Sequence, residues 1–122
     1  MSRPARNLSV ISQAPISAVQ ARARVNRVLL SQIGSQFCAG EPELSVLKET
    51  WRVPILLITP GLVVGEVGES VVSAITSEIE RRTPDEEIYA EAERLRKRHH
   101  AAIKTAFSRA RSAILSAERL YW

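Results

Sequence analysis

The stretch from residue 49 to residue 76 constrains the fold more than any other part of the chain. Its first half carries apolar side chains at every second position, as a β-strand with one buried face requires: Trp51, Val53, Ile55 and Leu57. Leu56 and Ile58 make the opposite face apolar as well, so we expect that face to be partly covered. A turn at residues 60–61 and a second strand over residues 67–75 follow. With a short strand at 44–48, the pattern predicts a small antiparallel sheet of two or three strands.

Proline and glycine residues refine this prediction. Pro54 has no backbone N–H to donate to a neighbouring strand, which favours an edge position for the first strand. Gly61, Gly65 and Gly68 do not have the spacing of a phosphate-binding loop, and the glutamates beside them would repel phosphate. We therefore interpret these glycines as turn and bulge residues, within a linker that joins the two strands.

A helix is predicted before the sheet, over residues 17–33. Ser17 and Gln20 have the spacing of a capping box. The apolar residues that follow recur every three or four positions and share one face: Ala18, Ala21, Val25, Leu29 and Ile33. Gly34 suits the C-terminal cap, and residues 35–43 are expected to form a loop.

A second helix is predicted after the sheet. Thr83 is expected to cap it, with Pro84 at its first position and Glu86 completing a capping box. Neither glycine nor proline occurs from there to residue 122, so a single helix is predicted over residues 84–120. Such a helix would be roughly 55 Å long, whereas a domain built from the other residues would be about 30 Å across. Its distal half must therefore overhang the domain, break or pack against another chain.

These elements define an α+β protein with an N-terminal helix, a small antiparallel sheet and a long C-terminal amphipathic helix. Its expected organisation is a disordered arm over residues 1–16, an α+β domain over residues 17–83 and the helix over residues 84–122.

Charge is strongly segregated along the chain. The net charge is +4, but residues 41–93 carry twelve acidic and four basic side chains, whereas residues 94–122 carry eight basic and one acidic. The ends therefore suit an anionic partner, unless the acidic middle and basic ends neutralise each other within one fold. The candidates for binding nucleic acid or an acidic protein are basic residues of the last helix: Arg94, Lys97, Arg98, Lys104, Arg109 and Arg111. A solvated outer face is the alternative, and a membrane surface is disfavoured because the apolar side is mostly alanine.

The apolar side of the same helix is a candidate interface with a partner protein or a second copy of the chain. Its members are Ile103, Phe107, Ala110, Ile114, Ala117 and Tyr121.

No residue pattern indicates catalysis. His99 and His100 are adjacent and would point about 100° apart on a helix, whereas helical metal ligands are spaced by three or four residues. Cys38 is the single cysteine and has no Cys-His-Asn signature around it. We therefore expect a protein that is not an enzyme, with no catalytic residues, metal or cofactor.

The location is expected to be cytoplasmic. The apolar run over residues 53–64 is too short to span a bilayer, and no secretory signal is recognisable at the N-terminus. Organelle targeting through the Arg- and Ser-rich N-terminus is the alternative.

Residues 49–79 resemble a pattern found in small bacterial proteins, in which Trp-x-Val-Pro is followed by Gly-x-Val-Gly-Glu and Val-Asp-Ala-x-Thr-Gly-Glu. This strand–turn–strand is similar to the PepSY-type module, an α+β unit with a helix on an antiparallel sheet. The matching residues are Trp51, Val53, Pro54, Gly65, Val67, Gly68, Glu69, Val72, Ala74, Thr76, Glu78 and Ile79. Ser73 and Ser77 stand where the pattern has Asp and Gly.

The resemblance covers about a quarter of the chain and implies a non-enzymatic role similar to that of toxin–antitoxin or other partner-binding components. The expected function is an antitoxin-like binding or regulatory module that docks its C-terminal helix on a partner. Non-specific nucleic-acid binding by the basic face of that helix is the alternative.

Overall fold

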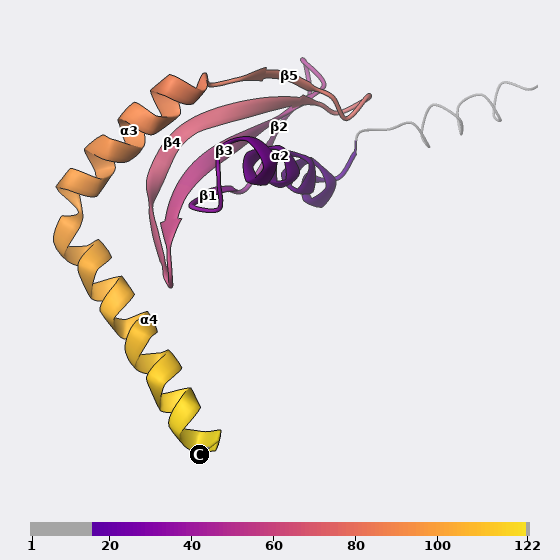
Figure 1. Ribbon diagram of the computed structural model, residues 1–122. Helices are drawn as coiled ribbons and strands as arrows, with labels where there is room; N and C mark the ends of the chain where they lie inside the picture. The colour runs from indigo at the N-terminus through magenta and orange to yellow at the C-terminus, as the bar shows by residue number, and fades with distance from the viewer. Residues whose placement is uncertain (1–15, 122) are drawn as a thin grey trace, which may run out of the picture.

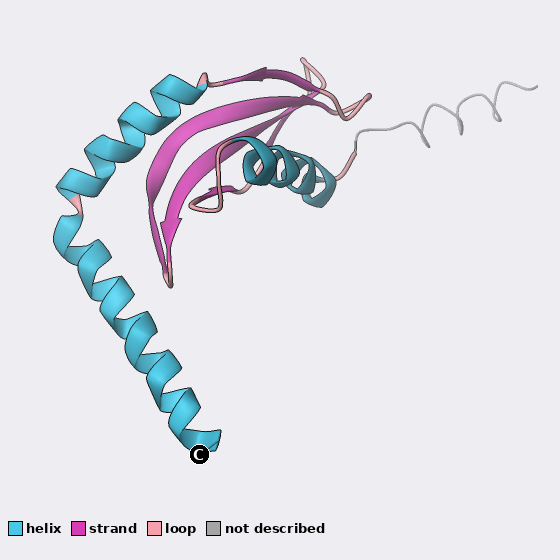
Figure 2. Cartoon of the chain, viewed as in Figure 1, coloured by secondary structure: helices cyan, strands magenta, loops and turns pink. Residues whose placement is uncertain are grey.

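The computed structural model describes residues 16–121, with side chains as far as residue 117. The predicted N-terminal arm, apart from Ile16, lies outside the described residues. The chain is α+β, as predicted, with a curled antiparallel sheet and three described helices (Figures 1 and 2). The elements are α2 (Ala18–Gln32), β1 (Phe37–Ala39), β2 (Glu43–Ser45), β3 (Thr50–Thr59), β4 (Leu62–Ser73), β5 (Ile79–Arg82), α3 (Asp85–Arg98) and α4 (His100–Tyr121).

The sheet is larger than the predicted two or three strands. Its order is β1-β3-β4-β5, and β2 pairs with β3 alongside β1. The loop predicted over residues 35–43 contains β1, and β5 follows the turn after β4. Both were missed because strands of three or four residues are too short to display a period of two.

Pro54 lies in a central strand, so the predicted edge position is wrong. β3 pairs with β4 on one side and with β1 and β2 on the other. The Pro54 carbonyl accepts a hydrogen bond of 2.7 Å from the Gly40 N–H, and the N–H that proline lacks would point to the same side of the strand. That side faces the break between β1 and β2, where no ladder bond is lost.

The predicted linker between the two main strands is instead a tight turn at residues 60–61, after which β4 begins at Leu62. The register of β3 against β4 shifts twice, next to Gly68 and next to Gly65, which confirms both as bulge residues. A Cβ at Gly65 would lie 3.0 Å from the Leu95 side chain, and one at Gly68 would lie 2.9 Å from Thr83. These glycines therefore let α3 and its preceding segment approach β4.

One core joins α2, the sheet and α3, and we call residues 16–98 the body. The predicted capping box is present, with Ser17 Oγ accepting from the Gln20 N–H at 3.1 Å and Gln20 Oε1 accepting from the Ser17 N–H at 2.7 Å. The predicted apolar face of this helix is confirmed, and α2 lies within the curve of the sheet (Figure 1). The core includes Ala21, Val25, Leu29 and Ile33 from α2 and its end, Val53, Ile55 and Leu57 from β3, and Ile88, Ala92 and Leu95 from α3.

Thr83 does not cap α3, contrary to the prediction. Its hydroxyl accepts a hydrogen bond of 2.9 Å from the Glu69 N–H of β4, and Pro84 occupies the cap position without a side-chain bond. The threonine is thus committed to tertiary structure, and three acidic residues, Asp85, Glu86 and Glu87, occupy the first turn instead.

The predicted single C-terminal helix is broken at His99, whose φ and ψ are −110° and 26°. Leu95 is the last buried residue of α3. Beyond the break the chain changes direction, and α4 passes the tip of the β3–β4 hairpin and extends away from the body (Figure 1). Two of the three outcomes expected for so long a helix, a break and an overhang, therefore occur together.

Candidate partner-binding surface on the last helix

The apolar side chains of α4 are exposed where those of α3 are buried. Ile88 and Leu95 of α3 have 0% and 7% of their surface exposed. In α4 the exposed fractions of Phe107, Ile114 and Leu115 are 52%, 60% and 49%. The body covers only the start of α4, because the sheet ends at the β3–β4 turn (Figure 1).

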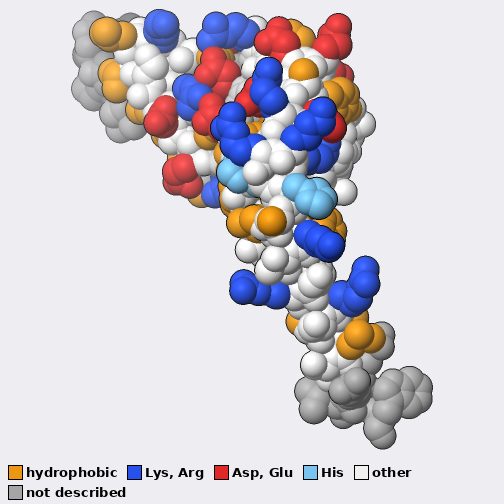
Figure 3. Space-filling view, turned by 90° about the vertical axis from the view of Figure 1, so that its left-hand side faces the viewer, with side chains coloured by type: hydrophobic (Ala, Val, Ile, Leu, Met, Phe, Trp, Pro, Cys, Tyr) orange, Lys and Arg blue, Asp and Glu red, His pale blue; other side chains and the backbone are white. Residues whose placement is uncertain are grey.

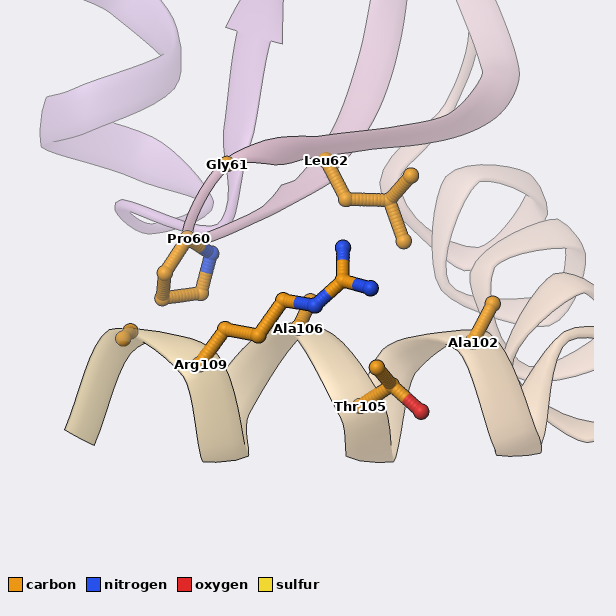
Figure 4. A pocket seen from close by; sticks show the side chains of 8 residues that line it. Pro60, Gly61, Leu62, Ala102, Thr105, Ala106 and Arg109 are labelled. Carbon is orange, nitrogen blue, oxygen red and sulfur yellow. The ribbon is translucent and has the colours of Figure 1, made fainter. Parts of the chain in front are cut away.

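An open groove of about 520 Å³ separates α4 from that turn (Figure 4). Pro60, Gly61 and Leu62 form the hairpin wall, and Leu62 points toward the helix. On the helix the groove is lined by small side chains together with one cation: Ala102, Thr105, Ala106, Arg109 and Ala110. Apart from Thr105 and Arg109, the side chains that line this groove are apolar.

Arg109 brings a positive charge into this groove. Figure 4 shows its side chain extending from α4 into the space between the helix and the hairpin. It also lines a second hollow of about 430 Å³, which runs along the polar side of α4 with Lys104, Thr105, Ser108 and Ser112. Among the described side chains, no carboxylate forms an ion pair with Arg109.

The break at His99 divides the predicted basic residues between two helices. Arg94 belongs to α3, where its Nε donates to Glu91 at 3.0 Å. Lys97 and Arg98 end α3, whereas Lys104, Arg109 and Arg111 lie on α4, and all five are exposed. Figure 3 shows acidic and basic side chains mixed over the body, but only basic ones along the visible face of α4. The predicted residues therefore do not form one straight basic stripe.

The predicted apolar interface is placed as follows. Ile103 and Ala110 are half-buried, whereas Phe107, Ile114 and Ala117 are exposed. Tyr121 is helical, but its side chain lies outside the described part of the chain. Sequence reasoning missed Leu115, which lies off the three-and-four spacing, and the hairpin wall, which only the fold brings next to α4.

The body, by contrast, contains a cluster of charges that pair with one another. Arg52 on β3 contacts three carboxylates, those of Glu43, Glu66 and Glu69. Its hydrogen bond to Glu69, together with the nearby negative charges, raises the pKa of Arg52. The acidic middle of the chain is thus partly neutralised by its own arginines, and among the described side chains no ion pair joins it to α4.

No other constellation in the described residues suggests chemistry. They contain no group of three or more His, Cys, Asp or Glu side chains arranged to hold a metal ion. Cys38 lies in β1 opposite Leu56, and burial raises the pKa of its thiol although Arg22 opposes that shift. The groove at α4 is lined by neither Cys38 nor the two histidines. None of the described helices is long and apolar enough to cross a membrane.

Comparisons with protein-family models, curated proteins and solved structures found no match for this chain.

Proposed function

We propose that this protein is a non-enzymatic binding module that docks α4 on a partner protein. The observation that carries the proposal is the exposure of Phe107, Ile114 and Leu115 on a helix that projects from the body. Burying a fully exposed side chain of this kind contributes about 1.5–3 kcal/mol. About half of each of these three is exposed, so covering each would contribute roughly half of that value.

The antitoxin-like character of this role is what the PepSY-type resemblance implies, and one backbone feature is compatible with the resembled pattern. Ser77 has a φ of 72°, a conformation that glycine adopts most readily, and the resembled pattern has glycine at this position. The turn between β4 and β5 therefore has a backbone conformation suited to that pattern, although its residue differs.

Capture from a lysate of the native cell, followed by cross-link mapping, tests the proposal. We expect the wild-type chain to retain a protein that cross-links to α4, and Ile114→Glu to lose it. Leu47→Glu is the matched control, because Leu47 is 98% exposed on a turn of the body and the substitution adds the same charge. Equal retention by both variants, or cross-links to the body alone, would contradict the proposal.

Non-specific binding of nucleic acid by the basic side chains is the second candidate. It is favoured by the composition of residues 100–117, which include Lys104, Arg109 and Arg111 and no acidic residue. Each phosphate neutralised releases counterions, so the affinity should fall steeply with salt. Replacing Arg94, Lys97, Lys104 and Arg111 with Gln should weaken binding to all sequences and flatten the salt slope. If no DNA or RNA is shifted at about 50 mM salt, the second candidate is discarded and the first is unaffected.

A further inference from the structure

The groove between α4 and the β3–β4 turn has the shape of a seat for a helix. Its helical wall carries alanine at 102, 106 and 110, which are spaced by four and lie on one side of α4. Side chains this small let a second helix approach at the short end of the usual 8–10 Å between axes. Pro60 and Leu62 border the open side of the groove and would contact a helix that lies over it along α4.

The apolar surface continues beyond the groove, which determines the length of the occupant. Ile114 lies four residues beyond Ala110 on the same side of α4, and Phe107 lies next to both, so the exposed apolar surface continues along the helix past the groove. From Ala102 to Ile114 the helix rises about 18 Å. A small molecule filling the groove would leave Phe107 and Ile114 exposed, so an elongated peptide segment fits better.

The positive charges of α4 indicate which kind of elongated partner fits this surface. Arg109 reaches into the groove, while Lys104 and Arg111 lie beside the apolar side chains of α4, and no described carboxylate pairs with any of the three. A second α4 packed along this surface would place these cations next to their own equivalents, which is unfavourable. Nucleic acid would match the charge but would not bury Phe107 or Ile114.

We infer that the groove and the adjoining face of α4 bind an acidic amphipathic helix of a partner protein. This inference rests on the proposed function and adds the chemistry of the partner. The apolar side of the partner helix packs on Ala102, Ala106 and Ile114, and its flanking carboxylates pair with Arg109 and Lys104. Such charge-assisted contacts at the edge of an apolar strip set the orientation and specificity of a docked helix.

Two designed peptides of about 21 residues test this inference with the full-length chain. Both carry Leu and Ala on one face, and their polar face is all Glu in one peptide and all Lys in the other. Fluorescence anisotropy of labelled peptide at about 100 mM salt gives the dissociation constants. We expect the acidic peptide to bind at least ten times more tightly than the basic one, because ion pairs with Arg109 and Lys104 at the edge of the apolar surface can form only with the acidic peptide.

Variants locate the site. Arg109→Glu should weaken acidic-peptide binding about tenfold and strengthen binding of the basic peptide. Arg27→Glu is the matched control, since Arg27 is an exposed arginine on α2, and it should change either affinity less than twofold. Ala106→Gln fills the groove without changing charge and should also weaken binding. Circular dichroism of each variant verifies that the fold is unchanged.

Several outcomes would overturn the inference. Equal losses in Arg109→Glu and Arg27→Glu would show that net charge alone attracts the peptide. Failure to bind the acidic peptide at about 100 μM would also overturn the inference, since a dissociation constant above this value is weaker than ordinary specific docking. A concentration-dependent dimer disrupted by Ala106→Gln would assign the groove to a second copy. If lysate capture still depends on Ile114 in any of these cases, the proposed function survives and only the acidic helix is rejected.

Discussion

α3 and α4 are consecutive amphipathic helices, yet they have opposite environments. Both repeat apolar residues every three or four positions and carry arginines between them. Ile88 in α3 is completely buried, whereas Ile114 in α4 is 60% exposed. α3 lies against β4, with Leu95 filling the space that Gly65 leaves, but the sheet ends at the turn that α4 passes. An amphipathic pattern therefore reports that a helix has a partner, without reporting whether that partner belongs to the same chain.

The charges of the two regions differ in the same way. Arg52 in the body is surrounded by carboxylates from β2 and β4, and Arg109 on α4 reaches into an open groove. The core and the charge cluster at Arg52 are packed within the body, whereas the apolar residues of α4 lie on a helix that extends past the end of the sheet, and this contrast is the reason for proposing a binding role for α4. Matched substitutions in the two regions test this contrast.

The largest difference in the loss of stability is expected when two isoleucines, one in each region, are truncated to alanine. Ile55→Ala removes a fully buried side chain from β3 and should lower the free energy of unfolding by about 2–5 kcal/mol. Ile114→Ala removes a mostly exposed one and should change it by less than about 0.5 kcal/mol. Urea denaturation of both variants measures the two values. Similar losses would mean that α4 packs on the body in solution and would refute the contrast.

Two threonines give the next largest difference. Thr83→Ala removes the hydroxyl that accepts the Glu69 N–H, and the unpaired donor should cost about 1–3 kcal/mol. Thr105→Ala, on exposed α4, removes a poor helix former and should be neutral or stabilising by about 0.5 kcal/mol. The same denaturation experiment compares them, and a neutral Thr83→Ala would show that the Glu69 N–H finds another acceptor.

Replacing Arg52 of the body and Arg109 of α4 should give a smaller difference in stability. Arg52→Gln removes a guanidinium with three carboxylate contacts, but the side chain is 37% exposed and solvent screens it. The loss should therefore be about 1 kcal/mol or less and should shrink as salt is raised. Arg109→Gln should leave stability unchanged at any salt concentration. A loss in Arg52→Gln that does not depend on salt would point to lost packing rather than lost charge interactions.

The smallest effect concerns pH and the single cysteine. Because burial raises the pKa of the Cys38 thiol, less thiolate is present in the folded chain than on an exposed residue at the same pH. The contribution of the neutral Cys38 thiol to stability is complete below the pKa that the thiol has in the unfolded chain. It is lost as pH rises through the higher pKa that the thiol has in the folded chain. We expect Cys38 to react with a thiol reagent more slowly than the exposed Ser112→Cys on α4, measured in a Cys38→Ala background. Equal rates would show that β1 opens readily at this edge of the sheet.

Local patterns predicted the parts of this fold that depend on neighbouring residues. The capping box at Ser17 and Gln20, the buried face of α2, and the alternation of Val53, Ile55 and Leu57 all follow from the periods of a helix and a strand. The positions of Gly65 and Gly68 at bulges were also recognisable. In the candidate site, the residue types on α4 were predicted, since the apolar and basic side chains belong to one continuous helical pattern.

Features that depend on residues distant in sequence were not predictable in this way. Thr83 has the sequence of a helix cap, yet its hydroxyl is used by β4, fourteen residues away. Pro54 fits a central strand only because the neighbouring edge is interrupted at Gly40. The break at His99, the approach of Pro60 and Leu62 to α4, and the exposure of Ile114 depend on where the curled sheet ends. The sequence alone determined which faces of the chain must be covered, because local periodicity sets them; only the tertiary structure decided which of them the chain covers itself, because that depends on contacts between distant segments.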